Sequence, residues 1–215
     1  MSNKLVGKYF SIKNYVIENG YAHEIEWQND VCFDELDESS FLREIAWVIL
    51  SSGMKESVIR NIFEKFSKCF FNWSSSELIS KNKDECFFKA LNHFNNKNKV
   101  SAIIFAAEKI NTIGFRRFKN DIIDDPIEKL QEFPYIGPVT VYHLVKNIGL
   151  SYAKPDRHLK RIAKREGYCD VQLFCQQISK LTGDSIPVVD IVFWRFATIT
   201  NDYLTILSIL DEKEI

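Results

Sequence analysis

Residues 130–161 read LQEFPYIGPVTVYHLVKNIGLSYAKPDRHLKR, and the spacing of proline, glycine and apolar residues in this stretch is the strongest indication of the fold. Near its start, FPYIGP places two prolines and a glycine between two segments whose apolar residues return every three or four positions. Such a pattern is typical of a tight hairpin between two helices. Pro134 fixes one backbone dihedral of the hairpin, and Gly137 permits a positive φ or the close approach of a ligand. The sequence therefore predicts two hairpin-linked helices within about residues 127–148.

The hairpin also offers backbone donors. Its N–H groups, with those of Val139 and Thr140 at the start of the second helix, can converge on a phosphate oxygen, and the helix dipole favours that negative charge. Helical hairpins that contain proline and glycine also occur in proteins that bind nothing. Taken alone, the hairpin leaves open both a phosphate site and a purely structural turn.

Outside this stretch, the periodicity of apolar residues favours helices almost throughout. Helices are expected at FLREIAWVILSSG behind a cap at Ser39 or Ser40, at ESVIRNIFEKFSKCF, at SSSELI behind a serine cap, at VSAIIFAAEKI, at HLKRIAKREG, around VQLFCQQISKL and at VVDIVFWRFAT. Alternating strand patterns are scarce, although residues 21–32 can hold a short extended piece. The predicted fold class is all-α.

Composition limits the possible functions. The chain has 215 residues, of which 46% are hydrophobic and 27% charged, close to the globular average and unlike a disordered chain. Its net charge of −1 creates no global field, so any site for a polyanion must be a local patch. No apolar run approaches the roughly 18 residues of a membrane helix, and MSNKLVGKYF lacks the apolar stretch of a signal peptide. We expect a soluble, cytoplasmic protein without membrane contact.

The five cysteines form no CxxC pair, which suits reduced thiols in a cytosol. Cys169 and Cys175 lie close together in sequence but lack the two further ligands that a zinc or iron–sulfur site needs. No metal site is expected, and no cofactor.

Charge is unevenly spread along the chain. From Tyr142 to Arg165 the local charge is +6, and from Met1 to Ser40 it is −5. The basic residues are Lys146, Lys154, Arg157, Lys160, Arg161, Lys164 and Arg165, against Asp156. A near-neutral chain can carry a nucleic-acid face in this way, although a basic run is also a common solvated helix surface.

Two motifs within residues 130–161 resemble the motifs of a known protein family. Residues 133–141 read F-P-Y-I-G-P-V-T-V, and residues 155–161 read P-D-R-H-L-K-R, with Asp156 nineteen positions after Gly137. They resemble the hairpin L-P-G-apolar-G-x-x-T-A and the later apolar-D-T-H-apolar-x-R of the helix-hairpin-helix DNA glycosylase superfamily, which contains endonuclease III and the alkyladenine glycosylases. Upstream, FLREIAWVILSSGMKESVI is similar to the family's segment before a DNA-facing loop. The resemblance covers roughly Ser39 to Arg161 and, more weakly, the last predicted helix.

The chain departs from the family pattern at three positions. Tyr135 stands where the family has the first glycine of the hairpin, and Val139 stands where lyase-competent members carry a nucleophilic lysine. The glutamine that many members push into the gap left by an extruded base aligns with Gly53, which leaves Ser52 or Met54 as the wedge.

The resemblance implies a mechanism. A flipped-out base requires firmly held phosphates beside it, a task suited to the hairpin. Breaking the N-glycosidic bond builds positive charge on the sugar, which a carboxylate stabilises while it orients water. Asp156 is the expected catalytic residue, and its alternative role as a helix N-cap is compatible with catalysis.

The same resemblance supplies further site residues. DNA contacts are expected at Pro134, Tyr135, Ile136, Gly137, Val139, Thr140, Lys154, Arg157 and Lys160. The base pocket or wedge is expected at Trp47, Ser52, Met54, Tyr135, Tyr142 and His143. Backbone contacts are also expected from a loop before the hairpin that holds Arg116, Arg117 and Lys119.

The sequence thus predicts a two-lobed helical protein: a helical barrel at 41–148, and a second lobe of 1–40 plus 149–215 that carries Asp156. The predicted function is that of a monomeric, monofunctional glycosylase that removes a damaged or modified base from double-stranded DNA, in the cytoplasm or at a bacterial nucleoid. Three alternatives stay open: a non-catalytic helix-hairpin-helix DNA-binding protein, a glycosylase directed at modified bases of foreign, viral DNA, and a helical protein-interaction domain.

Overall fold

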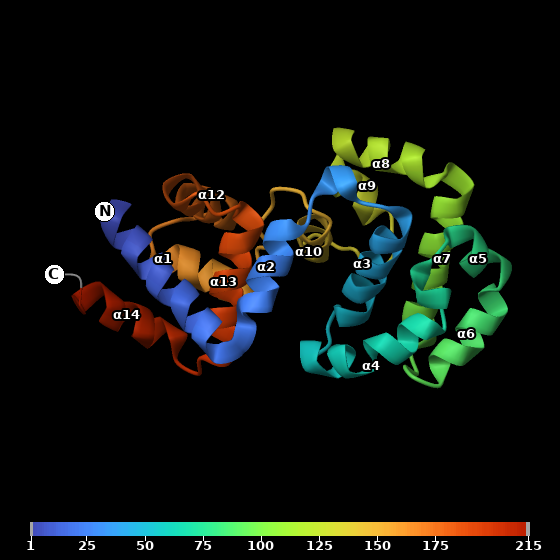
Figure 1. Cartoon of the computed structure of the whole chain (residues 1–215), viewed down its shortest axis with the longest axis horizontal. Coiled ribbons are helices and arrows are strands. Elements are labelled where there is room, and N and C mark those ends of the chain that lie inside the picture. Colours follow the sequence, from blue (N-terminus) through green and yellow to red (C-terminus); the bar gives the residue numbers. More distant parts are fainter. Residues whose placement is uncertain (1, 214–215) are drawn as a thin grey trace. The chain divides into compact units, whose positions relative to one another are not determined.

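The computed structural model describes residues 2–213, and the side chains of residues 4–211. This part of the chain is built from helices and contains no strand, which confirms the predicted all-α fold (Figure 1). None of the helices described is both long enough and apolar enough to cross a bilayer.

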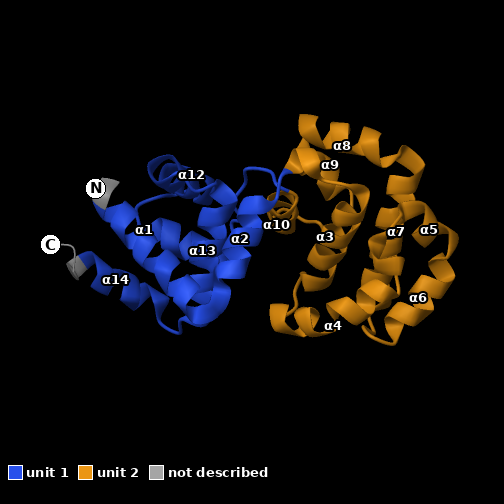
Figure 2. Ribbon diagram, in the orientation of Figure 1, with its two compact units in different colours: residues 1–32, 149–215 blue, residues 33–148 orange. Residues whose placement is uncertain are grey.

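The chain forms two compact units, coloured separately in Figure 2. Unit 2 is the continuous stretch 33–148, whereas unit 1 combines residues 1–32 with residues 149–215. Residues 33–40, expected in the second lobe, belong to unit 2. Contacts within unit 2 explain this: Lys119 Nζ donates to the carbonyls of Asp34 and Leu36 at 2.8 and 2.9 Å, and the Glu38 carboxylate accepts from Ser76 N at 2.6 Å.

Unit 2 is an all-helical body whose central helices are α3 and α7. Its elements are η2 (Phe33–Glu35), α3 (Glu38–Ser51), α4 (Glu56–Lys68), η3 (Phe71–Trp73), α5 (Ser76–Lys81), α6 (Lys83–Leu91), α7 (Lys97–Ile113), α8 (Phe115–Asp124), α9 (Pro126–Gln131) and α10 (Thr140–Asn147). Helix α3 packs against α4, α7 and α10. Its Phe41 ring is buried and meets Phe118 edge-on, with the ring centroids 5.0 Å apart, so aromatic packing ties α3 to α8.

Capping residues set the helix boundaries in unit 2. Ser75 caps α5 as predicted, by accepting a hydrogen bond from Leu78 N at 3.2 Å. The cap of α3 is Asp37, which accepts from Ser40 N at 2.7 Å, so the expectation of a cap at Ser39 or Ser40 was wrong. An aspartate two residues upstream satisfies the same unpaired N–H groups, and the serines become the first turn of the helix.

Unit 1 surrounds one buried helix, α13. Its elements are α1 (Ser2–Val16), a π-helical turn η1 (Ile17–Tyr21), α2 (Ala22–Asp30), α11 (Arg157–Arg165), α12 (Val171–Thr182), α13 (Ile186–Ile199) and α14 (Tyr203–Lys213). Helix α13 packs against α1, α2, α11 and α12. Its buried residues include Val189, Val192 and Phe193, which is why its sequence shows almost no polar face.

The extended piece suggested for residues 21–32 was wrong, because most of that segment is helix α2. The Arg195 guanidinium on α13 donates to both oxygens of Glu24, at 2.8 and 2.5 Å, and both side chains are buried. This ion pair spans 171 residues, so no local pattern in residues 21–32 reports it.

Candidate nucleic-acid interface and active site

The predicted hairpin lies between α9 and α10 in unit 2 and is anchored by its apolar residues. Phe133 and Ile136 are buried, and Ile136 N donates to Phe133 O at 3.1 Å to close the turn. Pro134, expected among the DNA contacts, is exposed, whereas the Ile136 side chain is not. Ile136 therefore anchors the hairpin and can offer DNA only its backbone.

Thr140 organises the turn from inside. Its Oγ1 accepts a hydrogen bond from Gly137 N at 2.6 Å and donates to Tyr135 O at 2.9 Å. The Gly137 N–H is therefore occupied within the protein, and the DNA contact expected at Gly137 stays a prediction. The threonine hydroxyl replaces an external acceptor and makes the turn rigid without a ligand.

Two consecutive amides at the start of α10 remain available. Within the part of the chain that the structure describes, the N–H groups of Val139 and Thr140 have no acceptor, and α10 has no side-chain cap. Unpaired donors at a helix N-terminus attract anions, and the helix dipole adds to the attraction. At the start of α10, the amides that remain available to an anion are thus those of Val139 and Thr140.

The left-handed residue of the hairpin is Tyr135, with a φ of 68°, and not Gly137, whose φ is not in the positive region. A side chain in this conformation costs roughly 1 kcal/mol, because Cβ crowds the following carbonyl. Glycine adopts this conformation without a side-chain penalty, and the chain nevertheless carries an aromatic residue there. Its side chain is 38% exposed.

Lys99, which sequence reasoning missed, lies beneath this turn. It extends from the first turn of α7, and only 4% of its surface is exposed. Its Nζ donates to Leu50 O and Ser52 O, both at 2.6 Å, and lies 5.6 Å from the centroid of the Tyr135 ring. Burial lowers the pKa of the ammonium. One lysine thus joins the end of α3, the following turn and the hairpin.

The turn after α3 carries both wedge candidates. Gly53 has a φ of 69° and turns the chain between Ser52, which is half-buried, and Met54, which is 42% exposed. Lys99 contacts both Ser52 O and the Tyr135 ring, so these two candidates lie near one another. Met54 is the residue of this turn with the more exposed side chain.

The remaining pocket candidates are less accessible. Trp47 is half-buried and packs edge-on against Phe63, with ring centroids 5.0 Å apart, which makes it part of the aromatic core of unit 2. Tyr142 and His143, on α10, are also half-buried.

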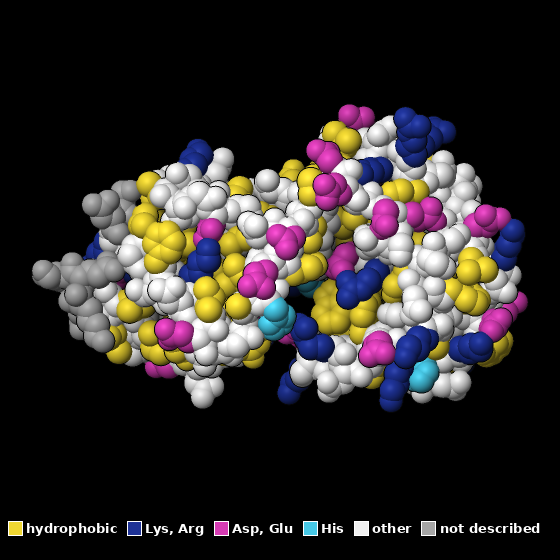
Figure 3. Space-filling model, viewed as in Figure 1, with side chains coloured by type: hydrophobic (Ala, Val, Ile, Leu, Met, Phe, Trp, Pro, Cys, Tyr) yellow, Lys and Arg dark blue, Asp and Glu magenta, His cyan; other side chains and the backbone are white. Residues whose placement is uncertain are grey.

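The expectation that Arg116, Arg117 and Lys119 lie in a loop was wrong, because all three belong to helix α8. Arg116 and Arg117 are exposed, and Figure 3 shows basic side chains over the part of unit 2 where Figure 1 places α8. Lys119 is committed to the carbonyls of residues 34 and 36. Of the three residues, only Arg116 and Arg117 therefore remain available for the expected contacts with the DNA backbone.

In unit 1, Asp156 caps helix α11. Its Oδ1 accepts hydrogen bonds from His158 N at 2.8 Å and from Leu159 N at 3.0 Å. Its other oxygen, Oδ2, has no hydrogen-bond partner among the described residues, and the side chain is partly exposed. The cap predicted from the sequence is therefore present, and it fixes the carboxylate while leaving one oxygen for another partner.

Two side chains missed by sequence reasoning hold the loop before Asp156. The buried Asp190 carboxylate on α13 accepts from Lys154 N at 2.7 Å. Gln172 on α12 accepts from Ala153 N at 2.8 Å and donates to Ser151 O at 3.0 Å. The loop backbone is thus pinned at several points from within unit 1.

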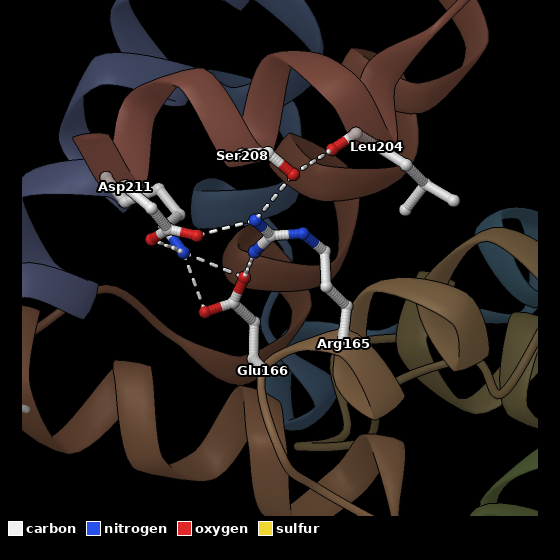
Figure 4. Close-up of polar contacts among 6 residues, drawn as sticks. Arg165, Glu166, Leu204, Ser208 and Asp211 are labelled. Atoms are coloured by element: carbon white, nitrogen blue, oxygen red, sulfur yellow. Dashed lines mark hydrogen bonds and ion pairs between the residues drawn. The ribbon is translucent and has the colours of Figure 1, made fainter. Parts of the chain in front are cut away.

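The far end of α11 is anchored by the network drawn in Figure 4. Arg165 donates to Asp211 at 2.5 Å and to Ser208 at 3.1 Å, and it also pairs with the neighbouring Glu166. Buried Lys8 on α1 bonds Glu166 and Asp211, each at 2.7 Å. These ion pairs connect α1 and α14 to the helix that carries Asp156.

The basic run of 142–165 is not one surface. Lys146 is buried in unit 2, and Arg165 is engaged in the network just described. The exposed cations are Arg157, Lys160, Arg161 and Lys164, all on α11. The charge available to a polyanion is therefore concentrated on the helix that Asp156 caps.

His158, next to this cap, is held by packing. Its Nδ1 lies 3.3 Å from the Tyr203 hydroxyl, and burial lowers the pKa of the imidazole. A lowered pKa favours the neutral ring at pH 7.

No family model matches the chain, and no curated protein matches its sequence. Among solved structures, the chain is similar to the 8-oxoguanine glycosylase/lyase of Methanocaldococcus jannaschii, which was crystallised with a 15-mer DNA containing 8-oxoguanine. The alignment covers 91% of this chain and 98% of that chain, with a TM-score of 0.55 and 18% identity. At this identity the similarity speaks for the fold, and the chain has the helical fold of that DNA glycosylase, as the hairpin and the aspartate motif predicted.

Proposed function

We propose that the protein is a monofunctional DNA glycosylase that hydrolyses the N-glycosidic bond of a damaged or modified base flipped out of duplex DNA. The observation that carries this proposal is the state of Asp156: Oδ1 is locked by two backbone N–H groups, and Oδ2 has no partner among the described residues. A carboxylate that is fixed but not fully satisfied is what stabilisation of a developing sugar cation requires.

The proposed reaction needs a carboxylate in two respects. As the base leaves, the sugar gains oxocarbenium character, and a nearby negative charge lowers the energy of that state. Asp156 Oδ2 can also accept a hydrogen bond from the attacking water and orient it. The water oxygen bonds to C1′, the glycosidic bond breaks, the base leaves with the bond's electron pair, and the proton that the water loses ends on the released base.

The hairpin supports the DNA-binding half of the proposal. Its two unpaired amides, at Val139 and Thr140, suit a phosphate oxygen, and contacts of this kind position a duplex without reading its sequence. The exposed cations of α11 add attraction for the backbone. In this region the proposed DNA contacts are Lys154, Arg157 and Lys160.

The positions of the amines support a reaction without strand cleavage. A lyase needs a nucleophilic amine at C1′, and Val139 stands where the related motif has lysine. Lys146 is buried, and the buried ammonium of Lys99 donates to two carbonyls, so its protons are held in place. We therefore expect the product to be an intact abasic site, in contrast to the solved neighbour, which is described as a glycosylase/lyase.

The test is mass spectrometry of free bases released from duplexes that carry oxidised, alkylated, deaminated, mismatched or naturally modified viral bases. Release of one class by the wild-type protein and not by Asp156→Asn supports the proposal and identifies the substrate. DNA binding without release from any member of the panel would favour the non-catalytic alternative. Absence of salt-sensitive DNA binding would favour a protein-interaction domain.

A further inference from the structure

Tyr135 is the residue of the hairpin whose presence local structure explains least. Its φ of 68° is a conformation in which a side chain is a cost, and glycine would remove that cost. Strain of this kind is retained where the side chain has a use. The backbone needs nothing from the ring, because Thr140 already closes the turn through Tyr135 O.

The ring is supported from the protein side. The Lys99 ammonium lies 5.6 Å from its centroid, within the range of a cation–π contact. Since that ammonium is fixed by Leu50 O and Ser52 O, it holds the ring to the end of α3. The ring is nevertheless 38% exposed, so it is positioned without being buried.

The surroundings of the ring match one kind of ligand. Val139, four residues on, exposes 39% of its side chain, and its N–H is one of the two unpaired amides at the start of α10. An anion-binding pair of amides and a supported, exposed aromatic ring thus lie in the same turn. A nucleotide offers both partners, a phosphate and a flat aromatic base, and base stacking on aromatic rings is a sequence-tolerant contact.

We propose that Tyr135 stacks on a nucleobase of the bound DNA, and that Lys99 is the positioning residue that holds its ring for this contact. The inference rests on the DNA binding of the proposed function and deepens it. It requires neither base release nor the catalytic role of Asp156.

The first experiment is photocrosslinking. Duplexes with 5-iododeoxyuridine placed at successive positions around a stable abasic-site analogue are irradiated in complex with the full chain, and the adducts are mapped by mass spectrometry. Iodouracil couples to aromatic side chains that stack on it, so we expect an adduct at Tyr135 from one or two positions. Efficient crosslinking elsewhere, with none at Tyr135 from any position, would overturn the proposal.

The second experiment uses matched variants. Tyr135→Phe should bind DNA like the wild type, whereas Tyr135→Gly should bind about tenfold more weakly, the size of one lost base stack. Tyr135→Gly should still fold, because relief of the left-handed strain offsets the added entropy of glycine in the unfolded chain. Wild-type affinity in Tyr135→Gly would contradict the proposal.

A double-mutant cycle between Lys99 and Tyr135 tests the positioning role of Lys99. Lys99→Met should weaken DNA binding severalfold in the presence of Tyr135, should be partly rescued in Lys99→Arg, and should add little in a Tyr135→Gly background. Lys119→Met is the control, because Lys119 also donates to two carbonyls and lies 5.4 Å from a ring centroid, but that ring belongs to the buried Phe33. Additive effects of Lys99→Met and Tyr135→Gly would show a merely structural lysine.

The outcomes separate the two proposals. A Tyr135 adduct without base release from any substrate would leave the stacking role standing and refute the glycosylase. Base release by the wild type, together with wild-type DNA affinity in Tyr135→Gly, would support the glycosylase and refute the stacking role. If no DNA binding is found, both fail.

Discussion

The Asp190 carboxylate accepts a hydrogen bond from the backbone N–H of Lys154, at 2.7 Å, two residues before Asp156. A buried side chain on α13 therefore sets the path of the loop that delivers the candidate catalytic carboxylate. We expect Asp190→Ala to lower the single-turnover rate of base release by at least about tenfold, since misplacement of a reacting group by about 1 Å costs that much or more. Asp190→Asn keeps an acceptor and should retain more activity. DNA affinity, measured by fluorescence anisotropy, should change little in both, and a wild-type rate in Asp190→Ala would remove the residue from this role.

Asp156→Asn should abolish base release while DNA affinity stays the same or rises. Asparagine keeps the shape and much of the capping ability but removes the charge that faces the developing cation, a loss on the order of a hundredfold or more in rate. The matched control is Asp170→Asn, because Asp170 caps α12 in the same unit by accepting from Leu173 N at 2.8 Å. Equal rates in the wild type and Asp156→Asn would refute the catalytic assignment, as would equal losses in the two variants.

Gly137→Asp should weaken the binding of damaged and undamaged duplexes alike. A Cβ at Gly137 would meet only Thr140 Oγ1, at 3.9 Å, so the substitution leaves the hairpin intact and adds a carboxylate beside the proposed phosphate site. Gly137→Asn is the neutral control and should lose less affinity, as measured at several salt concentrations. Selective loss of one substrate would place Gly137 in the base pocket instead.

Borohydride added during turnover should trap no covalent protein–DNA adduct. A Schiff base needs an amine at C1′, and the position used by lyases is Val139. Denaturing electrophoresis of labelled DNA reports both the adduct and any strand cut. If an adduct forms, its loss in Lys154→Ala or Lys99→Met would identify the amine and end the monofunctional assignment.

Glu44→Gln should raise the melting temperature at neutral pH. Burial raises the pKa of Glu44, whose Oε2 accepts from Asn147 Nδ2 at 3.0 Å. Because the folded state holds the proton to higher pH than the unfolded chain does, the stabilising effect of the protonated form is lost as pH rises through the folded pKa. The difference between variant and wild type should therefore shrink as pH is lowered, and calorimetry at a series of pH values measures it. A melting-temperature difference that grows as the pH is lowered would contradict a raised pKa for Glu44.

The parts of the fold that sequence predicted are those encoded locally. The hairpin, the cap at Asp156 and the amphipathic helix α4 each depend on residues a few positions apart, and periodicity and capping rules report them. The parts it could not predict depend on contacts between distant residues: Lys99 bonds a carbonyl 49 positions away, Asp190 a loop 36 away, and Glu24 an arginine 171 away. A buried lysine or aspartate inside an apolar segment is the one local signal that such a partner exists, because a charge is buried only when it is paired.

The discontinuity of unit 1 has a consequence for how the chain is made. Helices α1 and α2 leave the ribosome before unit 2 does, but the helix they cover, α13, starts at Ile186, after all of unit 2. At roughly 5–20 residues per second, that interval is on the order of ten seconds. Unit 2 is contiguous and can fold before α13 is synthesised, whereas the apolar faces of α1 and α2 stay uncovered during this time. Chaperone engagement during synthesis is therefore expected at the apolar faces of α1 and α2, and a gene rearranged so that these helices follow α14 should shorten their exposure.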